Sequence, residues 1–161
     1  MIKKFNNFRI TENDEYDDES DFRRMQMRVD DSSDSGSNTK KKVYLAGGWS
    51  GWRDIIIEEF KDKNIEWLDP RTATKKSNWF EMEVEMVRKA DLVVGWITSD
   101  NKSGFGMTYE LGMSYALNKP YIFINEQELG AYKWDMQRSG AVESFSNHKD
   151  AFEWIRKNNW L

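Results

Sequence analysis

The chain has 161 residues, enough for one domain, and a formal net charge of −4. It contains no cysteine, which excludes disulfides and thiolate sites, and one histidine, His148, which disfavours histidine-based catalysis and a multi-histidine metal site. The acidic balance argues against a nucleic-acid polymer as the main partner. No apolar run reaches the ~20 residues of a membrane span and no signal peptide is visible, so we expect a cytoplasmic protein with no membrane partner.

The N-terminal part of the chain differs in texture from the rest. Its stretches "ENDEYDDESD" and "DDSSDSGSNTKKK" are charged, polar and poor in periodic apolar residues. Such a segment buries too little apolar surface to offset the entropy lost on ordering. We therefore predict an acidic, disordered tail over residues 1–41 and one α/β domain over residues 42–161.

From residue 42 onward, predicted strands and helices alternate. Strand patterns occupy residues 42–48, 65–71, 91–97 and 120–125, and helical patterns occupy residues 52–63, 78–90, 108–119 and 148–158. In the first helix, Ile55, Ile56 and Phe60 are predicted to share the buried face. The alternation predicts an open, mostly parallel sheet flanked by helices, a Rossmann-like or flavodoxin-like three-layer sandwich. Such sheets bind ligands beyond the carboxyl ends of their strands.

Two predicted strands end in motifs that suit a ligand. "LAGGWSGW" follows the first strand, and its Gly47 and Gly48 would let the backbone approach an anion, with Arg53 able to accept a 5′-phosphate. The alternative is a mere tight turn. "LDPR" follows the second strand, where Asp69 and Arg71 either face the crevice or form a loop salt bridge.

The predicted helix over residues 78–90 carries three alternating acids, Glu81, Glu83 and Glu85. Alternate residues of a helix diverge by about 200°, so the three cannot share one face. One of them can point to the crevice while the others remain solvated.

A further carboxylate, Glu110, follows the glycine-rich stretch that contains Gly104 and Gly106. We expect it near the positive end of a helix, which favours its charged form, with Tyr109 helping to set it. A charged carboxylate at that place can act as a nucleophile or stabilise a cation. Glycosyl transfer uses both abilities, because its transition state resembles an oxocarbenium ion.

Taken together, "VYLAGGW", "LDPR", "EVEMVRKADLVVGWI" and "GFGMTYELGMSYALNKP" resemble the nucleoside 2-deoxyribosyltransferase family and its relatives, which include deoxynucleotide N-glycoside hydrolases. The likeness extends from about Val43 to Asn125. It implies that Glu110 is the nucleophile, that Glu83 handles the nucleobase and its proton, and that Tyr44 lies near the nucleophile. It also implies that Gly47, Gly48 and Trp49 line the sugar and base pocket. Asp69, Pro70 and Arg71 resemble an "N/D-P-R" motif of one branch of the family, which implies that Asp69 and Arg71 bind the substrate.

The sequence departs from this pattern at one place. Many members carry Asp or Ser six residues before the nucleophile, where this chain has Gly104, with Ser103 and Asp100 nearby. The resemblance also implies a homo-oligomer in which a neighbouring subunit completes the site, and Asp135 or Met136 lies in the corresponding region. Several of the eight tryptophans fall near loops, which suits stacking of flat ligands or an oligomer interface.

The resemblance implies an enzyme that passes the sugar of a nucleoside or nucleotide to a free nucleobase through a covalent ribosyl-Glu110 intermediate. One alternative is hydrolysis of (deoxy)nucleoside 5′-monophosphates, and another is a module that senses a nucleotide without turnover. None of these requires a metal or an organic cofactor.

Overall fold

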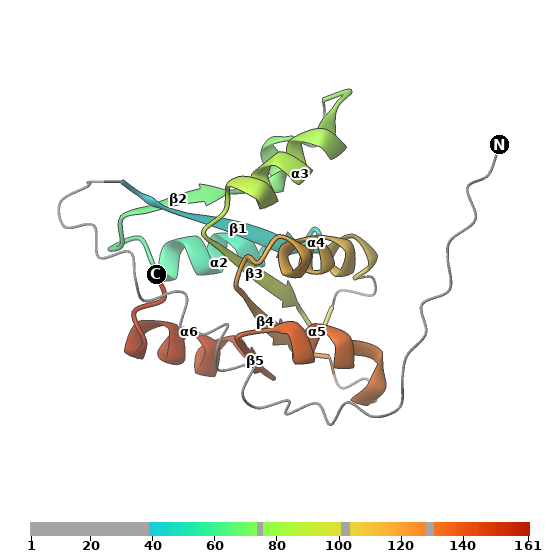
Figure 1. The fold of residues 1–161 in the computed structure, drawn as a ribbon. Helices are drawn as coiled ribbons and strands as arrows, with labels where there is room; N and C mark the ends of the chain where they lie inside the picture. The colour runs from blue at the N-terminus through green and yellow to red at the C-terminus, as the bar shows by residue number, and fades with distance from the viewer. Residues whose placement is uncertain (1–38, 74–75, 101–103, 128–130) are drawn as a thin grey trace, which may run out of the picture. The chain divides into compact units, whose positions relative to one another are not determined.

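Five parallel strands form one sheet in the order β2-β1-β3-β4-β5 (Figure 1). The strands are β1 (Lys41–Gly47), β2 (Ile65–Leu68), β3 (Leu92–Ile97), β4 (Tyr121–Asn125) and β5 (Glu143–Phe145). This arrangement confirms the predicted parallel α/β fold, and its strand order is that of flavodoxin-like sheets. The order reverses between β1 and β3, which makes the gap between their carboxyl ends the expected place for a ligand.

The computed structural model describes residues 39–161 except for 74–75, 101–103 and 128–130, and residues 39–161 form one compact unit. The predicted disordered tail therefore lies outside the described residues, apart from its last three. Lys41, the last residue of that predicted tail, already belongs to β1. Within the described part of the chain, no helix is long and apolar enough to cross a bilayer.

Helices cover both faces of the sheet (Figure 1). They are α2 (Trp52–Glu59), α3 (Trp79–Lys89), α4 (Phe105–Ala116), α5 (Asp135–Gly140) and α6 (His148–Lys157). Side chains of β1 alternate between two cores: Val43 and Leu45 pack with α2 and α6, whereas Tyr44 and Ala46 pack with α3 and α4. Tyr44 therefore projects toward the helix that carries Glu110.

Apolar patterning predicted most of these elements. All six residues of β3 are buried, as expected of a central parallel strand. The expectation for Ile55 is wrong, because its side chain is 50 % exposed while Ile56 and Phe60 are buried. The prediction also omitted α5 and β5. These elements are too short to show a clear hydrophobic period.

The glycine that ends β1 is required by its backbone and by its neighbours. Gly47 has φ +154°, and a Cβ there would lie 2.5 Å from the carbonyl oxygen of Trp96 and 2.8 Å from the Trp52 ring. Neither neighbour can move freely, since the first is backbone and the second is a buried indole. The turn after β1 is thus fixed by packing.

Gly47→Ala is expected to lower the free energy of unfolding by about 1–3 kcal/mol, because the new methyl group overlaps fixed atoms. Gly112→Ala is the matched control. It lies inside α4 with nothing within 4 Å of the added Cβ, and it should be neutral or stabilising by about 0.5–1 kcal/mol. Urea denaturation of both variants measures the difference. Equal stabilities would show that Gly47 is not constrained by its packing.

Candidate active site

The centre of the candidate site is a hydrogen bond between β1 and α4. The hydroxyl of Tyr44 donates to Oε1 of Glu110 at 2.5 Å, and both side chains are buried. Tyr44 lies on the strand and Glu110 on the helix that follows β3, so the pair lies at the point where the strand order reverses. Two residues that the sequence predicted for catalysis are therefore brought into direct contact.

Glu110 is less solvated than its place in the sequence suggested. It is the sixth residue of α4, beyond the first turn, where the helix dipole has little effect. Its side chain is 9 % exposed, and burial raises its pKa to about 7, against a hydrogen bond from Tyr44 that lowers it. The expectation that the helix end favours the charged form is wrong, because desolvation outweighs it.

Glu83 on α3 is the second carboxylate of the site. It is half-buried, and burial raises its pKa as well. Its negative charge in turn raises the pKa of both Glu110 and Tyr44, which places it close to the pair. Glu81 and Glu85 are exposed, and Glu85 pairs with Lys89 along the helix surface. Of the three acids, only Glu83 is half-buried, which agrees with the expectation that the three cannot share one face.

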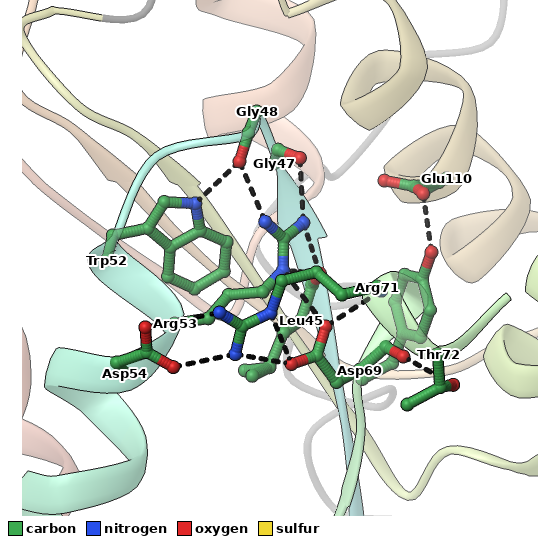
Figure 2. A network of polar contacts seen from close by, with 11 residues as sticks. Leu45, Gly47, Gly48, Trp52, Arg53, Asp54, Asp69, Arg71, Thr72 and Glu110 are labelled. Atoms are coloured by element: carbon green, nitrogen blue, oxygen red, sulfur yellow. Dashed lines mark hydrogen bonds and ion pairs between the residues drawn. The ribbon is translucent and has the colours of Figure 1, made fainter. Parts of the chain in front are cut away.

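The Arg53 side chain contradicts its predicted role as a phosphate ligand. It is 1 % exposed, and its guanidinium donates to three backbone carbonyls: Leu45 at 3.1 Å, Gly47 at 2.8 Å and Gly48 at 2.7 Å (Figure 2). Burial lowers its pKa, and nearby Asp69 opposes that change. With its donors directed at carbonyls, the guanidinium presents no free face to a bound anion.

The "DPR" motif forms a salt bridge rather than an open ligand site. Asp69 accepts from the backbone N–H of Arg71 at 2.9 Å and from its Nε at 2.8 Å, and it lies 3.7 Å from Nε of Arg53. Arg71 also binds both oxygens of Asp54 on α2 (Figure 2). Sequence reasoning missed Asp54, because a carboxylate in the first turn of a helix is ordinary and gives no signal of its distant partner.

The remaining predicted site residues differ in burial. Gly104 is buried, and a Cβ there would lie 2.5 Å from the Trp134 ring, whereas a Cβ at Gly106 would have nothing within 4 Å. Trp49 is 65 % exposed on the loop after β1, and Met136 is 84 % exposed on α5. Ser103 lies outside the described residues.

Tyr109 does not contact the carboxylate it was expected to set. Its ring packs 5.9 Å from that of Phe80 on α3, and more than half of its surface is exposed. Tyr44 supplies the hydrogen bond instead. Among the described residues, no group of three or more His, Asp and Glu side chains could hold a metal ion.

A profile of the family described as "Nucleoside 2-deoxyribosyltransferase like" matches residues 40–128, more than half of the chain. The chain belongs to this family. Among curated proteins, none matches it in sequence.

Solved structures are similar to this deoxyribosyltransferase-like chain at low sequence identity, and the two with the higher TM-scores share its fold. A 2-deoxyribosyltransferase from Bacillus psychrosaccharolyticus is 22 % identical with a TM-score of 0.57, over 69 % of this chain and 90 % of its own. A conserved protein from Enterococcus faecalis V583 is 18 % identical with a TM-score of 0.54, over 74 % and 99 %. A CMP N-glycosidase, BcmB, from Clostridium botulinum is 19 % identical with a TM-score of 0.49, over 72 % and 99 %.

The raised pKa of Glu110 predicts a pH-dependent effect on stability. An unfolded glutamate ionises near 4.5, whereas folded Glu110 ionises near 7. The contribution of Glu110 to the free energy of unfolding is fully present below pH 4.5 and is lost as the pH rises through 7, because ionising the carboxyl costs more free energy in the folded state than in the unfolded state. Glu110→Gln, which cannot ionise, should therefore be more stable than the wild type at about pH 8, by about 1–3 kcal/mol.

Guanidinium denaturation at about pH 5 and about pH 8 tests this expectation. The difference between variant and wild type should be small at the lower pH and grow toward the higher one. Glu85→Gln, the same substitution at an exposed position of α3, is the control. A Glu110→Gln difference that does not change with pH would contradict a raised pKa.

Proposed function

We propose that this deoxyribosyltransferase-like protein cleaves the N-glycosidic bond of (deoxy)nucleosides and transfers the sugar to another nucleobase. The observation that carries the proposal is the contact of Tyr44 with Glu110 beside a second carboxylate, Glu83, at the reversal point of the sheet. Two carboxylates of different environment are what retaining glycosyl transfer requires. Membership of the family supports the same reaction class.

In the first step, an oxygen of ionised Glu110 attacks C1′ of the sugar while the bond from C1′ to the base nitrogen breaks. Positive charge develops on the sugar, and the neighbouring carboxylate stabilises it. Glu83 donates its proton to the departing base, which is a poor leaving group when negatively charged. Burial raises the pKa of Glu83, which shifts it toward the protonated form that a general acid needs.

In the second step, a nitrogen of the incoming base attacks C1′ and releases the Glu110 carboxylate. Glu83, now ionised, takes the proton that the incoming nitrogen loses, which returns both acids to their starting states. Tyr44 holds Glu110 in place throughout, since its own pKa is raised and its hydroxyl remains a donor. Water in place of the base would give hydrolysis by the same two steps.

The alternative reaction, hydrolysis of 5′-monophosphates, depended on Arg53 as the cation for the phosphate. That support is absent, because Arg53 is bound to backbone carbonyls. Transfer to a base is therefore the reaction we propose. Hydrolysis and binding without turnover are outcomes of the experiment.

The test is incubation with a panel of deoxynucleosides, ribonucleosides and their monophosphates, each with and without a different free base, followed by chromatography. We expect a new nucleoside in the presence of the acceptor base. Glu110→Gln should lower the rate by about a thousandfold or more, because the covalent intermediate cannot form. Glu83→Gln should slow poor leaving groups most.

Glu85→Gln, two residues from Glu83 on the same helix but exposed, should retain the wild-type rate. Release of base with no new nucleoside would replace transfer by hydrolysis. Binding measured by calorimetry without any turnover would favour the sensing module, and substantial activity in folded Glu110→Gln would remove the proposed nucleophile.

We also propose that the protein self-associates. Large apolar side chains are exposed on three neighbouring helices, and contiguous patches of this kind usually mark interfaces. They are Trp79 and Phe80 on α3, Phe105, Tyr109 and Tyr115 on α4, and Met136 on α5. Contacts of α4 with α3 and with α5 support one continuous surface, and a second copy of the chain is the partner we propose.

Sedimentation of the full chain is expected to show a dimer or larger species at micromolar concentration. Phe105→Asp should shift it toward the monomer, because Phe105 is 86 % exposed and contributes little to the core of its own chain. Lys133→Asp, an exposed charge change in the short turn before α5, is the control. A wild-type protein that stays monomeric at every concentration would disprove self-association.

A further inference from the structure

Arg53 is a buried cation whose hydrogen bonds converge on the end of one strand. Nη1 donates to Gly48, and Nη2 donates to both Gly47 and Leu45, while Nε lies 3.3 Å from the Leu45 carbonyl. These carbonyls belong to residues that closely follow Tyr44 in the chain. Arg53 therefore fixes the backbone on the carboxyl side of the tyrosine that holds Glu110.

The Arg53 guanidinium also contacts two tryptophan rings and one carboxylate. The Trp52 ring lies 4.6 Å from its central carbon and the Trp49 ring 5.8 Å away, within the range of cation–π attraction. Asp69 neutralises part of the charge, and Asp69 is oriented by Arg71 (Figure 2). Trp49, the exposed ring at the edge of the site, is thus tied to the same buried group as the strand end.

The charge of Arg53 also reaches the carboxylate. Its positive charge lowers the pKa of Glu110 and of Glu83, against the burial that raises both. The other groups that act on the Glu110 carboxyl are Tyr44 of β1 and Glu83 of α3. Arg53 is the one cation among these groups in the described part of the chain, so its removal is expected to raise the pKa of Glu110.

We propose that Arg53 is a positioning residue for the Tyr44–Glu110 pair, holding the strand end and the Trp49 loop while supplying the fixed positive charge behind the carboxylates. The role of the pair in glycosyl transfer rests on the proposed function, whereas the geometry does not. A merely structural arginine would support the turn alone. A positioning arginine must also set the ionisation of Glu110.

The test follows Glu110 directly by ¹³C NMR of a glutamate-labelled protein, with the signal assigned by its absence in Glu110→Gln. Arg53→Met should move the titration midpoint of Glu110 upward by about one pH unit, because an opposing charge is removed. Asp69→Asn should move it downward, because the charge of Arg53 is no longer partly neutralised. Opposite directions from two neighbouring substitutions are not expected of a structural role.

Two further variants complete the series. Arg53→Lys keeps the charge but replaces the planar guanidinium, which reaches the carbonyls through three separate nitrogens, with a single ammonium nitrogen. The midpoint should therefore stay near that of the wild type while kcat/KM falls by about 10- to 100-fold. Arg156→Met removes a surface arginine that pairs with Glu59 and Asp62, and it should change neither quantity.

An unchanged Glu110 midpoint in folded Arg53→Met, or a shift of the same sign in Asp69→Asn, would overturn the proposal. If Arg53→Met does not fold, the other two variants test the proposal. A downward shift of the Glu110 midpoint in Asp69→Asn with an unchanged midpoint in Arg53→Lys supports it, and any other result overturns it. The titration needs no turnover, so a protein inactive on every substrate would refute the proposed function and leave the test of Arg53 intact.

Discussion

The site depends on one carboxylate that is buried and yet not paired with a cation. Glu110 has lost most of its water, and the hydroxyl of Tyr44 is its one direct hydrogen-bond partner in the described residues. Burial raises the pKa of Glu110 and the donated hydrogen bond lowers it, and the resulting pKa is about 7. Because that value is close to neutral pH, modest changes in nearby charge decide whether the carboxyl is ionised. Glu83 and Arg53 supply such charges with opposite sign.

The parallel sheet brings these groups together although they lie far apart in the sequence. The order β2-β1-β3-β4-β5 puts β1 beside β3, so a residue of β1 meets the helix that follows β3. Side-chain alternation then decides the partner, because Tyr44 faces α3 and α4 whereas Leu45 faces α2 and α6. Arg53, on α2, contacts the same strand through the backbone carbonyls of β1, which do not alternate between the two faces as side chains do. One strand thereby links the acid on one side of the sheet to the cation on the other.

Period and residue type were enough to predict many features of this chain. Buried strands, helix spacing and the place of Glu110 follow from patterns within about fifteen residues, whereas Glu83 was singled out from Glu81 and Glu85 only by the family resemblance. Sequence could not predict the state of Glu110, because desolvation depends on what packs above the helix. It also could not predict the use of Arg53, whose partners are backbone carbonyls and therefore carry no residue signature. Both Glu110 and Arg53 were expected to act on the substrate, but only the coordinates show that Arg53 binds backbone carbonyls instead.

Packing accounts for two of the glycines that suggested a ligand. A Cβ at Gly47 would meet Trp52 and the Trp96 carbonyl, and a Cβ at Gly104 would meet the ring of Trp134. Large indoles thus lie against the positions that lack a side chain, on the turn after β1 and at the start of α4. The same chain that has eight tryptophans needs small residues where their rings come close to the backbone. Glycine near a strand end is therefore evidence of close approach, and the approaching group at both places is the protein itself.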